Sequence, residues 1–308
     1  MAGSQGIFPK VLVVFLMVSL VFMGFEMIHF KESFGQALQE SLVGPWDSMV
    51  SEDILTVNKS RVRPAKPELN FRLLCAEDRQ RIKEVLEWDI KKTGWQTLTK
   101  YLAKTVTYPV QMACQQMKRL GHGIWSSKCY DGHKYVCIDD IDPKNCLVYS
   151  FGIANQISFE ESIATMGCEV YGYDVKNTDV MKTNANPRLH FKLARIGSQG
   201  GKQLMDLLQE NGHSNASITY LKVDIEGAET PALPIWIRSG ALNNTKQLSF
   251  EFHHVEKFAT QYWAIIQDLY RIGFRIISYD PNFCTTMSPK GFYQFFEIVF
   301  RKTKVCDE

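Results

Sequence analysis

Acidic side chains and histidines follow two apolar segments in the second half of the chain. One segment continues into Asp224-Ile225-Glu226-Gly227-Ala228-Glu229, and the next ends in Phe252-His253-His254. Three carboxylates exceed the single acid that caps a helix start, although one or two of them can serve the helix dipole. Histidine titrates near neutral pH and commonly acts as a general base. We therefore predict Asp224, Glu226 and His253 as catalytic residues that remove a proton from an acceptor.

A second pattern fits a cofactor that contains a ribose. The apolar residues before Ser150 and Phe151 lead into Gly152, with Ala154 close behind, and Asp174 ends the next apolar segment. A glycine after a strand, followed about 20 positions later by an acid, is typical of a dinucleotide-type site, because a carboxylate can accept two hydroxyl hydrogen bonds. A helix cap or a surface turn is the alternative role for Asp174. We predict cofactor binding by Ser150, Gly152, Ala154 and Asp174.

Alternating strands and helices must position these residues. Apolar runs typical of buried parallel strands occur at 146–151, 169–173, 189–193, 218–223 and 247–252, with helical patterns near 158–166, 202–210, 230–239 and 257–272. Segments 274–279 and 293–301 have the pattern of two strands joined by a loop. This order predicts an α/β fold, a Rossmann-like, doubly wound, mostly parallel seven-stranded sheet with helices on both faces.

The residues before this sheet have a different composition. We expect a cytosolic tail and membrane helix over 1–30, a stem over 31–72, a helical extension over 73–122 and the Rossmann-like domain over 123–308. Within the extension, a short helix is expected near 110–119. Asp131-Gly132 is typical of a hairpin turn between two short strands.

An apolar run near the N-terminus predicts a membrane anchor. Val11–Phe25 carries no charge, Lys10 precedes it, and no pair of small residues marks a cleavage site. We therefore favour a retained signal anchor, with a cleaved signal and a secreted protein as the alternative. Either places the body of the chain in the secretory pathway, in the lumen of the Golgi or endoplasmic reticulum for an anchored, single-pass type II protein.

Two further features agree with a luminal domain. Glycosylation sequons begin at Asn58, Asn215 and Asn243. All eight cysteines follow the anchor, and disulfides form in oxidising compartments. Cys129 and Cys137, on either side of Asp131-Gly132, are the first pair expected.

Several motifs carry a family resemblance. YLKVDIEGAE resembles the signature of FkbM-type methyltransferases, and KCYDGHKYVCID, LVYSFGIANQISFE and LSFEFHH are similar to the animal methyltransferase-like family over about residues 110–302. The resemblance implies a class I fold that binds S-adenosylmethionine, with Gly152 in the glycine loop, Asp174 on the ribose, and Asp224 and Glu226 at the mouth of the site. It also implies O-methylation, in several relatives of sugars.

The chain departs from this family pattern at two positions. Ser150 stands where many class I enzymes have an acid that meets the methionine amine, and Ala154 stands where a second glycine is usual. Both departures favour one alternative, a non-catalytic binding domain that retains the fold. Another alternative is a luminal type II glycosyltransferase, for which Asp140-Ile141-Asp142 would be the metal and sugar-nucleotide motif.

The balance of charged residues indicates which partners the chain is expected to bind. Lys and Arg number 35 against 33 Asp and Glu, so the chain lacks the basic surplus of a nucleic-acid-binding protein. A small-molecule or glycan acceptor is expected instead. Asp224 and Glu226 offer hard oxygen ligands, but the sequence assigns no metal to the site. Sequence therefore predicts an S-adenosylmethionine-dependent methyltransferase with a hydroxyl acceptor.

Overall fold

The computed structural model describes part of the chain. The described residues are Lys83, Val85, Glu87, Met112 and residues 114–122, 124–126, 129–176, 178–197, 200–285 and 293–302. The chain divides into two compact units, Met1–Pro64 and Ala65–Glu308. The expected anchor, the stem and the sequon at Asn58 lie outside the described residues. Among those that are described, no helix is both long and apolar enough for a membrane span.

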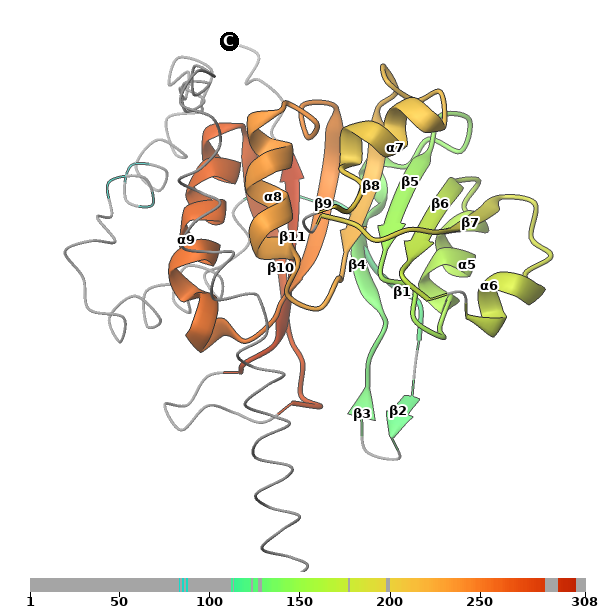
Figure 1. Cartoon of the computed structure of the whole chain (residues 1–308), viewed down its shortest axis with the longest axis horizontal. Coiled ribbons are helices and arrows are strands. Elements are labelled where there is room, and N and C mark those ends of the chain that lie inside the picture. The colour runs from blue at the N-terminus through green and yellow to red at the C-terminus, as the bar shows by residue number, and fades with distance from the viewer. Residues whose placement is uncertain are drawn as a thin grey trace, which may run out of the picture. The chain divides into compact units, whose positions relative to one another are not determined.

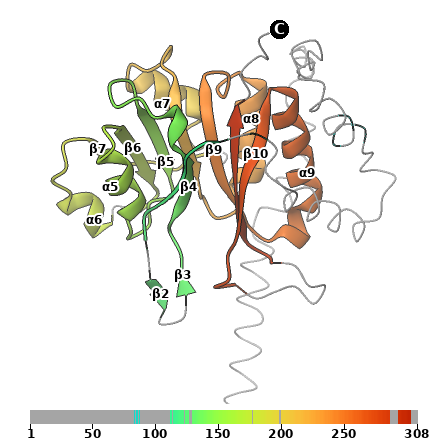
Figure 2. The same cartoon turned by 180° about the vertical axis from the view of Figure 1, so that it is seen from behind.

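One sheet of seven strands forms the centre of the second unit. Its strands follow the order β10-β11-β9-β8-β5-β6-β7, and Figures 1 and 2 show it from its two sides. β11 runs antiparallel to both β9 and β10, and the other strand pairs are parallel. The predicted Rossmann-like, mostly parallel sheet is confirmed. The strands are β5 Leu147–Phe151, β6 Glu169–Asp174, β7 Leu189–Leu193, β8 Ile218–Val223, β9 Thr245–Phe252, β10 Phe274–Pro281 and β11 Phe296–Lys302.

A helix follows each of the five strands from β5 to β9. Four of these helices match the periodic segments of the sequence closely. The exception is the helix at Asp179–Thr183, which has only five residues and no buried side chain, so the sequence shows no apolar periodicity there. The helices are α5 Ser158–Ala164, α6 Asp179–Thr183, α7 Leu204–Glu210, α8 Glu229–Arg238 and α9 Val255–Arg271.

Side chains that alternate along the strands form two cores. Tyr149 and Phe151 of β5 belong to the larger one, which includes buried residues of α7, α8 and α9, the helices in front of the sheet in Figure 1. Val148 belongs to the smaller one, with Phe159 of α5. All six residues of β8 are buried, because this central strand is covered on both faces, and this explains its continuous apolar run.

Two pairs of short strands precede the sheet. β1 Met117–Leu120 pairs with β4 Lys134–Cys137, and β2 Ile124–Ser126 pairs with β3 Cys129–Tyr130. The predicted hairpin turn at Asp131-Gly132 is wrong, because β3 and β4 do not pair with each other. Gly132 instead has a positive φ of 84°, and its N–H donates to the Asp131 side chain. These two residues bend the chain between β3 and β4 without reversing it.

The prediction of a short helix near 110–119 is also wrong from Met117 onward, where β1 begins. Residues from Met117 onward are extended because they pair with β4. The Asp139 carboxylate in η3 Ile138–Asp140 accepts the N–H groups of Gln115 and Gln116. Tertiary pairing therefore overrides the local helical pattern.

Two disulfides are present in the described part of the chain, Cys114–Cys137 and Cys146–Cys168. The first joins the segment before β1 to the end of β4. The second joins the residues that precede β5 and β6. The expected Cys129–Cys137 pair is therefore wrong, since Cys137 is bonded to Cys114. The general expectation that some cysteines are paired is met.

Candidate active site

The carboxyl ends of β5, β8 and β9 meet at one edge of the sheet. From β5 the chain continues to β6 and β7 on one side, and it then returns to β8 and β9 on the other. The strand order therefore reverses between β5 and β8, which is where ligands bind in open α/β sheets. Gly152 follows β5, Asp224 follows β8, and His253 follows β9. Most of the predicted site residues thus lie along this edge.

Gly152 lies against the backbone of Asp224. Its φ is +81°, and a Cβ built there would lie 1.6 Å from the Asp224 carbonyl oxygen. The Asp224 N–H donates to the Phe151 carbonyl. Glycine is therefore required by the contact between the two strand ends, whatever the cofactor needs. The exposed Ala154 also has a left-handed backbone, with φ of 49°, the conformation for which glycine is usual.

Asp174 holds the loop after Gly152. Its Oδ2 accepts the N–H groups of Ile153 at 2.9 Å and Ala154 at 2.8 Å, and its Oδ1 accepts the N–H of Lys176 at 2.8 Å. A carboxylate oxygen has two lone-pair sites. Oδ2 is therefore filled, whereas Oδ1 keeps one site for a hydroxyl donor.

Ser150 is buried beneath this loop and takes part in a polar network that sequence reasoning missed. Its hydroxyl donates to Glu160 Oε1 of α5 at 2.6 Å, and Lys222 Nζ of β8 lies 3.6 Å from that oxygen. Lys222 also donates to the Gly152 carbonyl. Ser150, Glu160 and Lys222 are each at most 5% exposed. The network therefore connects α5 and β8 to the backbone of the glycine loop.

Four carboxylates surround His253. Its Nε2 lies 3.5 Å from Glu226, 3.6 Å from Glu251 and 3.7 Å from Asp224, and its Nδ1 lies 3.3 Å from Glu229. His253 is 3% exposed and Glu229 is fully buried, whereas the Glu226 side chain is 88% exposed. Glu226 also has a left-handed backbone, with φ of 56°. A costly conformation in a residue other than glycine is common at functional sites.

These charges set the protonation of the site. Burial alone would lower the pKa of His253, but Glu229, Glu251 and Asp224 outweigh it and raise this pKa to about 10. Burial raises the pKa of Asp224, but Lys134, Lys222 and His253 have the larger combined effect and lower it. At neutral pH, His253 is therefore a charged donor and Asp224 is an ionised carboxylate.

Lys134, Glu251 and Glu297 extend the network under the sheet edge. Lys134 Nζ pairs with Glu297 Oε2 and lies 3.7 Å from Asp224 Oδ2. Burial disfavours its charge, yet Glu297, Asp224 and Glu251 hold the pKa of Lys134 well above its usual range. Burial and the charge of Asp224 raise the pKa of Glu251 to about 8. Sequence reasoning missed these residues, although a lone charge within an apolar strand, as in SFEF and FFEIV, was an available signal.

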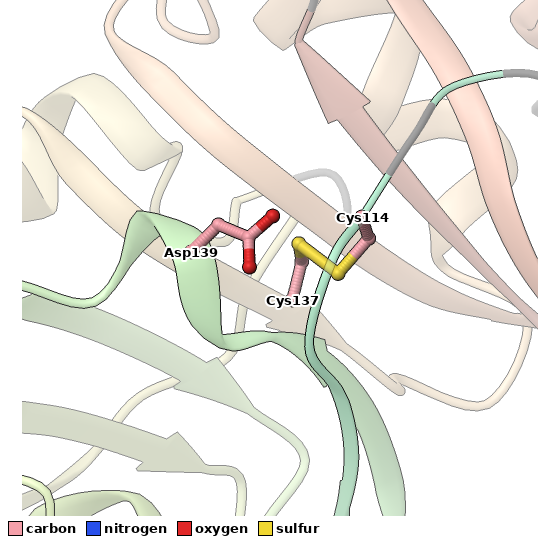
Figure 3. Close-up of side chains that lie close together, drawn as sticks. All are labelled: Cys114, Cys137 and Asp139. Atoms are coloured by element: carbon pink, nitrogen blue, oxygen red, sulfur yellow. A yellow bond between two sulfur atoms is a disulfide. The ribbon is translucent and has the colours of Figure 1, made fainter.

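Two other polar clusters are structural. Cys114 and Cys137 lie beside Asp139 in Figure 3, but their sulfurs are bonded to each other, so they offer no thiolate to a metal. Asp140 of the proposed glycosyltransferase motif accepts two hydrogen bonds from Arg301 and one from Gln247. Asp142 accepts bonds within its own turn. The triplet is therefore used by the fold.

Comparison with known proteins identifies the fold family. A family model described as a methyltransferase domain matches residues 89–287. The chain belongs to this methyltransferase domain family. No curated protein matches it.

Several solved structures are similar to this methyltransferase. A TehB-like SAM-dependent methyltransferase from Corynebacterium glutamicum is 12% identical, with 74% of this chain and 96% of that chain covered and a TM-score of 0.33. The Burkholderia thailandensis 1,6-didemethyltoxoflavin-N1-methyltransferase, solved with S-adenosylhomocysteine, is 12% identical, with 52% and 72% covered and a TM-score of 0.33. A Streptococcus thermophilus protein is 13% identical, with 54% of this chain but only 62% of that chain covered and a TM-score of 0.34.

The residues at the sheet edge fit S-adenosylmethionine, the cofactor expected of a methyltransferase domain. The free lone-pair site on Asp174 Oδ1 suits one ribose hydroxyl. In the loop beside it, Gly152 is half-buried and Ala154 is exposed. The buried Ser150 is held by Glu160. It supports the loop from below.

Proposed function

We propose that this methyltransferase transfers the methyl group to a hydroxyl of a sugar or another small molecule, in the manner of FkbM-type enzymes. The observation that carries the proposal is the exposed carboxylate of Glu226 above the buried charge of His253 and the half-buried charge of Asp224. This acid lies one residue beyond Ile225, in the turn between β8 and α8, beside the glycine loop. A hydroxyl acceptor that enters from solvent would meet Glu226 first.

Glu226 and His253 have different roles in the proposed reaction. S-adenosylmethionine supplies an activated methyl group, so alignment of the acceptor is the main requirement. The acceptor hydroxyl must lose its proton as the new bond forms, and Glu226 takes that proton. Protonated His253 cannot act as a base at neutral pH, because its pKa is raised to about 10. Its role is to hold Glu226 and Asp224 in place by charge.

A conservative substitution tests this assignment. Glu226→Gln keeps the size of the side chain and removes its basicity. We expect methyl transfer to fall by about 100-fold or more, the usual contribution of a general base, while S-adenosylmethionine binding is retained. The assay uses the full-length chain, labelled cofactor and a panel of glycans and small hydroxyl compounds.

A matched control uses Asp179→Asn, which removes an exposed carboxylate of α6 and should leave transfer unchanged. Equal turnover by the parent and Glu226→Gln would remove Glu226 from the mechanism. Tight cofactor binding by a parent that methylates no acceptor would favour the non-catalytic alternative.

We propose further that the domain works in the lumen of the secretory pathway, behind the N-terminal anchor predicted for Val11–Phe25. Disulfides favour an oxidising compartment, and two are present in the described residues. Asn215 and Asn243 of two sequons are exposed, as glycan attachment requires. Endoglycosidase should lower the apparent mass of the cell-expressed protein. Protease cleavage of the domain from the cytosolic side, without a mass shift, would reverse this orientation.

A further inference from the structure

The cluster around His253 contains more acid than its visible cations balance. Four carboxylates, those of Asp224, Glu226, Glu229 and Glu251, lie within 3.3–3.7 Å of the imidazole nitrogens. These separations exceed normal hydrogen bonds, which measure about 2.7–3.2 Å. The neighbouring Lys134 contacts Glu297 and lies on the Oδ2 side of Asp224. The Oδ1 side of Asp224 faces His253.

Two polar atoms in this cluster are buried and make no hydrogen bond, His253 Nδ1 and Glu229 Oε2. The other Glu229 oxygen accepts the N–H of Ile225 at 2.7 Å, which fixes the carboxylate in place. A buried oxygen or nitrogen without a partner costs stability, and such groups in a native protein need an explanation. Both atoms belong to side chain types that bind metal ions, and binding of an ion would release the proton that His253 carries in the metal-free chain.

The geometry points to a divalent transition-metal site formed by Asp224, Glu229 and His253, with Mn²⁺ as the ion that suits it. One ligand atom from each of these residues lies within 4.8 Å of the others. Two ligands on opposite sides of an ion lie about 4–5 Å apart when each bond is about 2.0–2.6 Å. Carboxylates suit Mn²⁺, and imidazole suits the transition metals generally.

Three different elements present these ligands. Asp224 follows β8, Glu229 is the first residue of α8, and His253 follows β9. The first two are five residues apart in the sequence, across a turn that contains the left-handed Glu226 and Gly227. This turn brings both acids toward the end of β9. Glu226 itself remains exposed above the cluster, where it can accept a proton.

The site deepens the proposed function, and its catalytic use rests on that function. A divalent ion at this position would bind the acceptor oxygen and make its hydroxyl more acidic. The proton would pass to Glu226, and the oxygen would then attack the methyl carbon while the sulfur keeps the electron pair of the broken bond. Binding of the ion itself requires neither cofactor nor acceptor.

Mn²⁺ titration of the chelator-treated, full-length chain tests the site, with the free ion followed by electron paramagnetic resonance. We expect one saturable Mn²⁺ per chain and an affinity at least about tenfold lower in Asp224→Asn and in His253→Gln. The control Asp179→Asn, on exposed α6, should bind like the parent. S-adenosylmethionine binding, measured on the same samples, shows which variants are folded.

The outcomes are separable from those of the methyl-transfer assay. No saturable Mn²⁺ binding by a parent that binds S-adenosylmethionine would overturn the site, and so would equal binding by both folded variants. If neither variant folds, the melting temperature of the parent, measured with and without Mn²⁺, tests the site instead. Saturating Mn²⁺ must raise it, because a ligand that binds only the folded chain stabilises that chain, and an unchanged value overturns the proposal.

Discussion

The carboxylates around His253 differ in what they can do at neutral pH. Lys134 and Lys222 help to keep Asp224 ionised, against the effect of its burial. Glu251 holds a proton, because burial and the charge of Asp224 raise its pKa to about 8. Burial and proximity, rather than residue type, therefore decide which acid is charged.

The free energy of unfolding should fall as the pH rises, because the pKa of Glu251 is higher in the folded chain than in the unfolded chain. Its pKa rises from 4.5 unfolded to about 8 folded, so its contribution is full below pH 4.5 and is lost as the pH rises through 8. For metal-free protein we expect a loss of about 1 kcal/mol per pH unit between pH 5 and 8 from this group. Glu251→Gln should remove that part of the slope. Urea unfolding at pH 5, 6.5 and 8 measures the difference.

The raised pKa of His253 also makes the free energy of unfolding fall as the pH rises, but over a higher pH range. Its pKa rises from 6.5 to about 10, so its contribution is full below pH 6.5 and disappears as the pH rises through 10. Below pH 6.5 His253 therefore adds no slope, and the difference between the parent and Glu251→Gln reports Glu251. Parallel stability curves for the parent and Glu251→Gln between pH 5 and 6.5 would contradict the raised pKa.

The sequence predicted where the site lies better than it predicted which residues form it. Residues directly after strands, such as Gly152, Asp224 and His253, could be located because strand ends are recognisable in the sequence and share one edge of the sheet. The contact of Lys134 with Glu297 could not be predicted, because these residues come from a separate strand pair and from the last strand. Their meeting depends on tertiary packing. The burial of Ser150 could not be predicted from the local sequence either.

Among the elements, the loop between β5 and α5 depends on an acid from β6. Two N–H groups of the loop, at Ile153 and Ala154, donate to Asp174. Asp174→Ala would release them and remove the acceptor offered to the ribose. We expect S-adenosylmethionine affinity to fall by about 1.5–3 kcal/mol, the usual value for charge-assisted bonds. Calorimetric titration of the full-length chain measures this loss.

Asp174→Asn separates the two roles of the acid. Its amide oxygen can still accept the two loop N–H groups, but its amide nitrogen cannot accept a ribose hydroxyl. Affinity should therefore lie between those of the parent and Asp174→Ala. Unchanged affinity in a folded Asp174→Ala variant would place the cofactor elsewhere.

Element prediction succeeded where periodicity was strong. The bounds of β7 and β8 match the predicted ones, because both strands are apolar runs between polar turns. β1 was missed because its pairing with β4 comes from residues 14 to 20 positions away, and α6 was missed because it buries nothing. The local pattern of apolar residues reveals neither a distant pairing partner nor a helix without buried side chains.

At the scale of the molecule, the Cys146–Cys168 disulfide and the site occupy opposite ends of β5. Cys146 precedes β5 and Cys168 precedes β6, so their disulfide joins the amino ends of neighbouring strands. A bond that closes a loop of about 20 residues is worth about 3 kcal/mol. Cys146→Ala combined with Cys168→Ala should therefore lower the free energy of unfolding by roughly that amount. Cofactor affinity at the other end should be preserved.

Denaturant unfolding with and without reductant measures the effect, since the double variant should respond less to reductant than the parent. Peptide mapping without reduction should recover Cys114 with Cys137 and Cys146 with Cys168. Recovery of these four cysteines as free thiols from cell-expressed protein would contradict both the pairing and the luminal proposal.

The contact between Gly152 and the Asp224 carbonyl has a consequence for how the two substrates bind together. Because the glycine loop and the acidic turn touch through backbone atoms, neither can shift without moving the other. Occupancy of one subsite should therefore change the affinity of its neighbour, and by thermodynamic reciprocity the effect must be equal in both directions. The affinity for the acceptor, measured with and without the methyl donor, should then change by the same factor as the affinity for the donor, measured with and without the acceptor.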